Sequence, residues 1–290
     1  MNSIVKKICF LHQLFKFEDL FVGFTRVLIA GCFAVGDIPR SDMVRMGLAI
    51  LFCILGLASI NSLNQIFDAD IDEINKPNRP IPSKKLTKKQ VLIISSSLSL
   101  CAGLLTLYLG FTYFLIAVAG LTLGLTYCVP QIYAKKIPIF STAVIAIGYG
   151  ILMFMVGWKV YQPISSIPLW LLSFLFIHDM IIANSKDFSD LEGDLQEGVK
   201  TIPVIFGKKR GALLCFFLYL LPFIFLLTLQ WTGYLATSFY PLVIMGIILG
   251  ISVFSLVSFD DRRYNYLGYL LSMITMIIVL IALFYSFVQL

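Results

Sequence analysis

The sequence predicts an all-α integral membrane protein. Of its 290 residues, 59% are hydrophobic and only 13% are charged, whereas a soluble domain carries about 25% charged residues. Apolar runs such as VLIISSSLSLCAGLLTLYLG, residues 91–110, have the length that a membrane-spanning helix needs. These runs lack the alternation of apolar and polar residues that marks the strands of a membrane barrel.

Nine segments are expected to span the membrane, because each is a mostly apolar window of helical length. In chain order they are residues 18–36, 44–66, 91–109, 112–129, 138–157, 168–185, 211–230, 238–257 and 267–289.

The connections between these segments predict the orientation of the chain. Lysine and arginine are concentrated in 67–90, 130–137, 186–210 and 258–266, which fall on the same side as the N-terminal tail. Basic loops remain cytoplasmic, so we expect the N-terminus and these loops in the cytoplasm and the C-terminus across the membrane. The net charge of +6 is attributed to these basic loops. Membrane lipids are expected partners, and no nucleic-acid partner is expected.

More than half of the acidic residues lie in two of these basic loops. Oxygen-bearing side chains recur at four-residue spacing: Asn64 at the end of the second span with Asp68 and Asp72 in the first loop, and Asp190 and Asp194 in the second loop. This spacing places them on one face of a helix, where like charges repel unless a cation lies between them. Solvated loop charges are the alternative explanation. The same acidic pattern recurs after two apolar helices of the same orientation, and this recurrence favours a functional explanation.

The two loops also resemble each other in order. Each has its acidic pair first, then an Ile-Pro step (Ile81-Pro82 and Ile202-Pro203), then paired lysines. We interpret this as a parallel pseudo-repeat of two four-helix units plus one helix. The chain would form a single domain, 1–290, with halves 1–137 and 138–290.

Carboxylate and amide oxygens with no His or Cys beside them favour Mg²⁺, which often shares its coordination with phosphates. Two such clusters flanked by basic residues predict a diphosphate site that holds more than one Mg²⁺ ion. If the diphosphate is attached to an allylic carbon, neutralising it promotes C–O cleavage. The resulting carbocation needs an apolar or aromatic cavity that excludes water.

At these motifs the sequence resembles the UbiA-type intramembrane prenyltransferases. Their first signature is similar to Asn64-x3-Asp68-x3-Asp72 followed by NKPNRPIPS (75–83), and their second to KDFSDLEGDLQEGVKTIPVIFGKKRG (186–211). A third block is similar to LTYCVPQIYAKK (125–136). The resemblance spans most of the chain and implies nine transmembrane helices around a central cavity.

The resemblance also implies residue roles. Catalysis and metal binding would rest on Asp68, Asp72, Asp190 and Asp194, with Asn64 as a further metal ligand. Diphosphate contacts would come from Arg79, Tyr127, Lys135 and Lys186. Asp187 would support the metal ligands without binding the ion itself.

The chain departs from the family pattern in places. Gln65 stands where many members have Asp, and Gln131 replaces a Pro of the third block. The segment before Lys186 lacks the Arg-Glu pair of some lipid-forming members, which argues against a close match to the archaeal ether-lipid enzymes.

The expected activity is Mg²⁺-dependent transfer of a prenyl group from an isoprenyl diphosphate to a lipophilic acceptor, aromatic or of the glycerol-phosphate type, with release of pyrophosphate. One alternative is a terpene cyclase that uses the same ionisation without an acceptor. A transporter is a further alternative, although its functional acids are expected near the bilayer midplane rather than beside basic loops.

Polar residues inside the spans are expected to face the interior, because intramembrane charge is costly. Arg26, His178 and Asp179 are therefore candidates either for the cavity or for a buried structural pair. Lys16, Glu18 and Asp19 are expected to mark the membrane interface.

Overall fold

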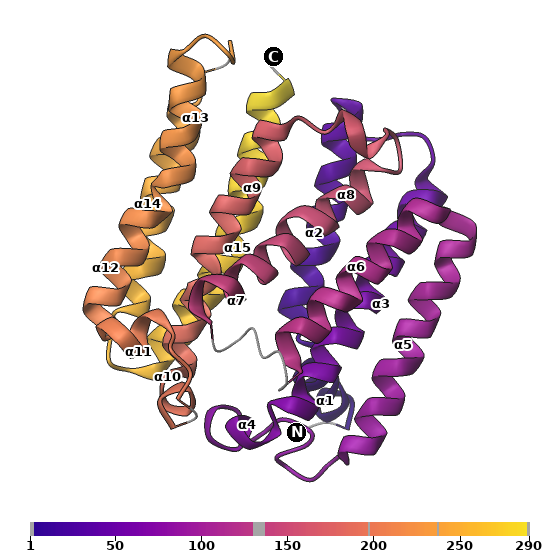
Figure 1. Cartoon of the computed structure of the whole chain (residues 1–290), viewed down its shortest axis with the longest axis vertical. Coiled ribbons are helices and arrows are strands. Elements are labelled where there is room, and N and C mark those ends of the chain that lie inside the picture. Colours follow the sequence, from indigo (N-terminus) through magenta and orange to yellow (C-terminus); the bar gives the residue numbers. More distant parts are fainter. Residues whose placement is uncertain (1–2, 130–136, 197, 237, 289–290) are drawn as a thin grey trace.

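The computed structural model describes residues 3–129, 137–196, 198–236 and 238–288, and all the regular elements in these ranges are helices (Figure 1). In chain order they are α1 (Ser3–Phe15), α2 (Phe17–Val35), α3 (Met43–Phe67), α4 (Ala69–Asn75), α5 (Lys88–Leu109), α6 (Phe111–Cys128), α7 (Pro138–Ile145), the π-helix η2 (Ala146–Leu152), α8 (Met153–Trp158), the 3₁₀ turn η3 (Ile164–Ser166), α9 (Leu169–Ile182), the 3₁₀ turn η4 (Ala183–Lys186), α10 (Asp187–Gln196), α11 (Ile202–Phe206), α12 (Lys208–Tyr219), α13 (Leu221–Trp231), α14 (Tyr240–Val257) and α15 (Arg262–Val288).

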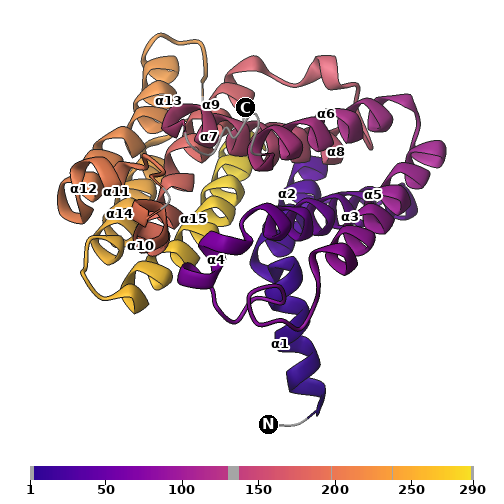
Figure 2. The same ribbon diagram turned by 60° about the horizontal axis from the view of Figure 1, so that its bottom comes forward.

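The long helices form a closed bundle. Helix α2 packs against α3 and α8, and α3 packs against α5 and α6. The last helix, α15, packs against both α14 and α2, so helices from the beginning and the end of the chain lie side by side in the bundle wall. The short helices α4, α10 and α11 lie together at one end, and α1 extends from that end (Figures 1 and 2).

The chain is a multi-pass membrane protein, as the sequence predicts. Among the described residues, seven helices are long and apolar enough to cross a membrane. The two remaining expected spans are also helical: α2 carries Glu18, Asp19 and Arg26, and α9 has only 14 residues before it continues as η4. The count of nine spans and the duplication of a four-helix unit stay predictions.

Local sequence explains where the expected helices are interrupted. The segment 211–230 is divided at Leu220, because Pro222 has no backbone N–H to continue the helical ladder. The segment 138–157 passes through the π-helix η2 before it reaches α8. In α8, Gly157 lets the backbones approach closely, since a Cβ there would lie 2.0 Å from the carbonyl oxygen of Val27 in α2.

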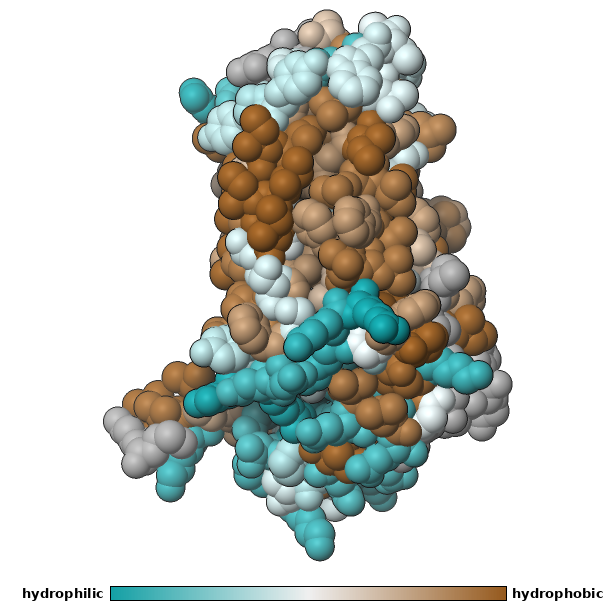
Figure 3. Space-filling view, turned by 90° about the vertical axis from the view of Figure 1, so that its left-hand side faces the viewer, coloured by the Kyte–Doolittle hydropathy of each residue, from teal (hydrophilic) through white to brown (hydrophobic). Residues whose placement is uncertain are grey.

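The surface of the bundle suits lipid. Leu107, Leu169 and Phe111 expose 82%, 78% and 72% of their area, and soluble monomers seldom expose large apolar patches of this kind. Figure 3 shows hydrophobic side chains over the face formed by α13 and α14, with hydrophilic side chains gathered toward the end that carries α10 and α11.

Arg26, His178 and Asp179 form a buried ionic cluster that joins α2 to α9. The Arg26 guanidinium binds both carboxylate oxygens of Asp179, with Nη2 at 3.3 Å from Oδ1, and His178 Nδ1 lies 3.1 Å from Oδ1. Arg26 and His178 are 2% exposed and Asp179 is fully buried. The structure therefore supports the structural alternative for these residues, since none of the three lines the cavity described below.

Arg26→Met is expected to lower the free energy of unfolding by ~3–5 kcal/mol, because it leaves the Asp179 carboxylate buried without its counter-ion. Thermal unfolding in detergent measures this effect, with the exposed Arg40→Met as the matched control. Adding Asp179→Asn to Arg26→Met should recover part of the loss. Equal stability of the Arg26 and Arg40 variants would contradict the structural role.

Candidate active site

The first acidic motif surrounds the bend between α3 and α4. Helix α3 ends at Phe67, and Asp68 connects it to α4. The Asp68 N–H still bonds to the Asn64 carbonyl at 2.9 Å, and the Asp72 N–H to the Asp68 carbonyl at 2.8 Å. The Asn64 amide also donates to Asp68 Oδ2 at 2.7 Å. The four-residue repeat is thus kept through a bend that the sequence does not predict.

The second acidic motif lies on α10, directly after η4. Asp190, Gly193 and Asp194 are buried in this helix, and Asp187 begins it as a half-buried residue. The four-residue spacing of Asp190 and Asp194 predicts that they share one face of a helix, and the structure has this part of the second loop as a helix.

Lys76 and Asn75 join the two motifs across the bundle. Lys76 Nζ lies 2.7 Å from both carboxylate oxygens of Asp190, 114 residues away. The Asn75 amide donates to the Asp190 carbonyl at 3.0 Å and its oxygen accepts from the Gly193 N–H at 3.0 Å. Lys186 Nζ lies 3.9 Å from Asp190 Oδ2. The two motifs are therefore parts of one site.

Glycine at position 193 makes this junction possible. A Cβ on Gly193 would lie 2.4 Å from Nδ2 of Asn75, well inside van der Waals contact. The glycine of the second motif is thus explained by packing, because the absence of a Cβ lets the Asn75 side chain lie directly on α10.

The cations of the site differ in how well they are neutralised. Arg79 Nη1 lies 2.5 Å from Asp72 Oδ2. Burial lowers the pKa of Arg79, but the carboxylates of Asp72, Asp190 and Asp68 together outweigh burial and raise it. Burial lowers the pKa of Lys76, and the Asp190 carboxylate only partly offsets this. A further anion beside Lys76 would therefore stabilise its ammonium form.

A cavity of about 400 Å³ opens beside the motifs and extends into the bundle. Asn64, Tyr127 and Lys186 line its polar part, together with Lys16, Asp19 and Tyr269. Its remaining wall is mostly apolar, and includes Phe52, Leu57, Ile116, Leu152, Met153 and Met276. The cavity therefore has one polar region next to the acidic motifs and an apolar body.

The oxygen donors fit a divalent metal that phosphate oxygens help to hold. Among the described residues, no three His, Cys, Asp or Glu side chains converge as a protein-only metal cage. The candidate ligands are instead divided between the α3–α4 bend and α10. This division suits Mg²⁺, which is commonly bound through one or two carboxylates plus substrate phosphates.

The structure brings together most of the predicted site residues. Those placed at the motifs or in the cavity wall are Asn64, Asp68, Asp72, Arg79, Tyr127, Lys186, Asp187, Asp190 and Asp194. Lys135 lies outside the described residues.

Sequence reasoning missed several polar residues of this region. Lys76 and Asn75 belong to the NKPNRPIPS block, which resembles a family signature and so marked this segment as functional. Their contact with α10 depends on the tertiary structure and could not be inferred from the block. Asp19 and Lys16 were predicted to mark the interface, yet both line the cavity, and Asp19 accepts from Tyr269 Oη at 3.4 Å.

Comparison with known proteins agrees with the family resemblance of the sequence motifs. The model of the UbiA prenyltransferase family matches residues 26–268. Digeranylgeranylglyceryl phosphate synthase of Korarchaeum cryptofilum is 34% identical over 199 residues, which cover 65% of this chain and 69% of that protein. Homogentisate phytyltransferase of Synechocystis sp. is 34% identical over 182 residues, 57% of each chain.

The fold is similar to that of a solved UbiA homologue from Archaeoglobus fulgidus bound to DMAPP and Mg²⁺. The TM-score is 0.70 at 16% identity, and the match covers 93% of this chain and 99% of that one.

Asn75→Ala is expected to lower the free energy of unfolding by ~1–3 kcal/mol, because it removes two buried hydrogen bonds and leaves their partners on α10 unpaired. Thermal unfolding in detergent provides the measurement. Asn78→Ala, an exposed asparagine in the same loop, is the matched control and should leave stability unchanged. If the two variants were equally stable, the Asn75 bridge would not hold the motifs together.

Proposed function

Because the chain belongs to the UbiA prenyltransferase family, we propose that it is a Mg²⁺-dependent intramembrane prenyltransferase. It ionises an allylic isoprenyl diphosphate and transfers the prenyl group to a lipophilic acceptor, aromatic or of the glycerol-phosphate type, with release of pyrophosphate. One observation carries this proposal: two acidic motifs from distant parts of the chain are joined at the polar region of an apolar cavity.

The diphosphate group of the donor binds between the α3–α4 bend and α10. Metal ligands come from Asn64, Asp68 and Asp72 on one side and from Asp190 and Asp194 on the other, and Asp187 supports them. Bound Mg²⁺ supplies positive charge that stabilises the leaving diphosphate.

Basic and hydroxyl groups of the chain complete the diphosphate site. Lys186 and Tyr127 line the cavity, and Arg79 is fixed beside Asp72. Lys135, which matches the family's third block, is proposed as a further contact. These groups hold the diphosphate oxygens as C–O cleavage develops negative charge on them.

The prenyl chain lies in the apolar body of the cavity. The wall formed by residues such as Phe52, Leu57 and Met276 is mostly apolar, and it keeps water from the allylic cation. The acceptor then attacks C1 of the donor. By the distribution of basic loops, the diphosphate region faces the cytoplasm, together with the N-terminus.

Asp68→Asn and Asp190→Asn are each expected to reduce Mg²⁺-dependent pyrophosphate release at least ~100-fold, because each removes a charge that holds the metal beside the leaving group. The assay uses purified protein in detergent, a membrane extract as the source of acceptor, and geranyl, farnesyl or geranylgeranyl diphosphate. Asp70→Asn is the matched control, since Asp70 is an exposed aspartate in α4, two residues after Asp68. It should retain wild-type activity.

The same assay separates the proposed function from its alternatives. Release that depends on the extract supports prenyl transfer, whereas release without it, together with a cyclic hydrocarbon or terpene alcohol, would indicate a cyclase. Folded protein that releases no pyrophosphate from any donor would refute both activities. Full activity of either the Asp68 or the Asp190 variant would refute the metal assignment.

A further inference from the structure

The elbow between α1 and α2 has an unusual backbone. Helix α1 ends at Phe15, α2 begins at Phe17, and Lys16 between them has φ 53° and ψ 82°. This left-handed conformation is uncommon for residues with a side chain, and Lys is not among those that adopt it most readily. Contacts from outside the elbow are therefore needed to select it.

Two side-chain amides of α3 provide those contacts. Gln65 Nε2 donates to the carbonyls of Leu14 at 2.6 Å and Gln13 at 3.1 Å, and Asn61 Nδ2 donates to the carbonyl of Phe15 at 3.0 Å. These carbonyls belong to the last turn of α1, where intrahelical donors are missing. Gln65 is fully buried. We call Asn61 and Gln65 the elbow clamp.

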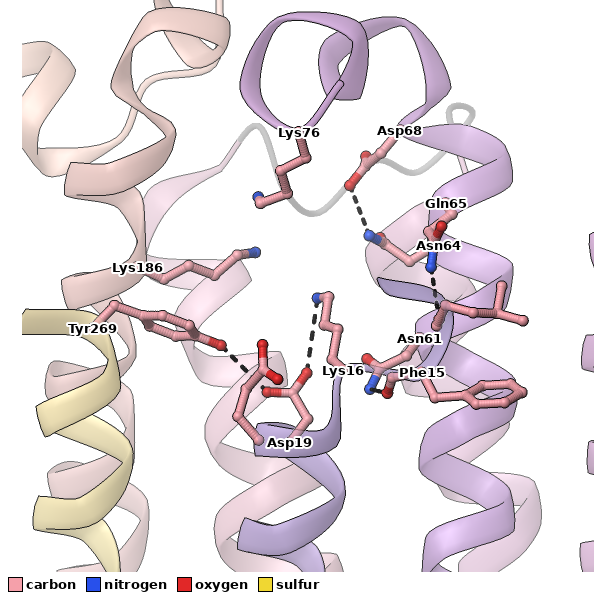
Figure 4. A network of polar contacts seen from close by, with 12 residues as sticks. Phe15, Lys16, Asp19, Asn61, Asn64, Gln65, Asp68, Lys76, Lys186 and Tyr269 are labelled. Atoms are coloured by element: carbon pink, nitrogen blue, oxygen red, sulfur yellow. Dashed lines mark hydrogen bonds and ion pairs between the residues drawn. The ribbon is translucent and has the colours of Figure 1, made fainter. Parts of the chain in front are cut away.

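The elbow clamp gives Gln65 a role of its own. Gln65 directly follows the metal-ligand candidate Asn64, but its amide group points to α1 rather than to the acidic motif (Figure 4). An aspartate at this position would have no N–H to donate. The elbow contact is thus a specific consequence of the amide at this position.

The clamped elbow directs Lys16 to the acidic motifs. Lys16 lines the cavity with Asn64 and Lys186, and its side chain is 14% exposed. Figure 4 shows the ammonium groups of Lys16, Lys76 and Lys186 pointing toward a common space that Asn64 and Asp68 border.

Lys16 is only loosely paired in this position. Its nearest carboxylate is Asp19, with Nζ 3.7 Å from Oδ2, whereas a direct charge-assisted hydrogen bond is about 2.7–2.9 Å long. Asp19 also accepts from Tyr269. Lys16 can therefore bind another anion without leaving Asp19 without a partner.

The charges around Lys16 favour a multivalent anion. Burial lowers the pKa of Lys16 to about 8 against the attraction of Asp19, and three nearby cations add to the lowering: Lys186, Arg79 and Lys76. Cations that influence one another in this way repel, so an anion placed among them is bound more strongly than by any one of them alone.

We propose that Lys16 is a further cation of the diphosphate site, and that Asn61 and Gln65 are positioning residues that hold it there through the backbone of the elbow. This inference rests on the proposed function, because the anion is the diphosphate of the donor. Lys16 lies outside the three motifs that resemble the family. It extends the site to the N-terminal segment of the chain.

The test measures the Kd of inorganic pyrophosphate, in the presence of Mg²⁺, for the full-length protein in detergent. Lys16→Met should weaken binding about tenfold or more, as expected for loss of a hydrogen bond to a charged group. Lys16→Arg keeps the charge and should stay within a few-fold of wild type. Lys88→Met, which removes an exposed lysine at the start of α5, should bind as wild type does.

The clamp is tested by a double-mutant cycle. Gln65→Glu replaces the donor with a carboxylate of the same shape, and it should also weaken binding. Because Gln65 acts through Lys16, the double variant Lys16→Met/Gln65→Glu should bind no more weakly than Lys16→Met alone. Fully additive losses would show that Gln65 does not act through Lys16.

The outcomes distinguish this inference from the proposed function. Wild-type binding that Lys16→Met leaves unchanged would overturn the role of Lys16 alone. A wild-type protein that binds no pyrophosphate would overturn the proposed function and the role of Lys16 with it. The Lys16 variants test the role of Lys16 in diphosphate binding even if Gln65→Glu fails to fold.

Discussion

The fold depends on the pairing of buried carboxylates with cations from other parts of the chain. Each ion moved into an apolar environment costs several kcal/mol unless a counter-ion compensates it. In the described part of the chain, six aspartates are buried: Asp19, Asp68, Asp72, Asp179, Asp190 and Asp194. Of these, Asp179 is paired with Arg26 and Asp190 with Lys76. Both pairs join segments that are far apart in sequence, so each neutralises a buried carboxylate and links two parts of the bundle.

The two pairs serve different purposes because their surroundings differ. The Arg26–Asp179 pair is enclosed by packed side chains and has no access to the cavity, which makes it a structural link between α2 and α9. The Lys76–Asp190 pair lies at the hydrophilic end of the bundle beside the cavity, where an incoming phosphate can compete for the ammonium. A bundle that is apolar elsewhere can thus bind a highly charged group at one end and enclose its hydrocarbon chain in the body of the cavity.

The sequence predicts local features of this architecture better than contacts between distant segments. Helix positions and the four-residue repeat of Asn64, Asp68 and Asp72 follow from local periodicity. The structure agrees except for the bend at Asp68, the π-helix within 138–157 and the break at Leu220. The partners of those groups could not be inferred in this way. In the sequence Lys76 is one of several loop lysines, and its role becomes apparent only when α10 is placed against α4. Gln65 resembles a substituted metal ligand in the sequence, whereas the structure shows its amide in contact with α1. Lys135 lies beyond what the structure describes.

The central claim is that the two acidic motifs bind one metal–diphosphate group between them. A crystal structure with Mn²⁺ in place of Mg²⁺ and geranyl thiolodiphosphate, a slowly reacting donor analogue, tests it most directly, because anomalous scattering locates the metal. The account predicts metal peaks between the α3–α4 bend and α10, with the diphosphate bridging them and the geranyl chain in the apolar cavity. Metal bound to only one motif, or a diphosphate bound elsewhere on the bundle, would contradict it.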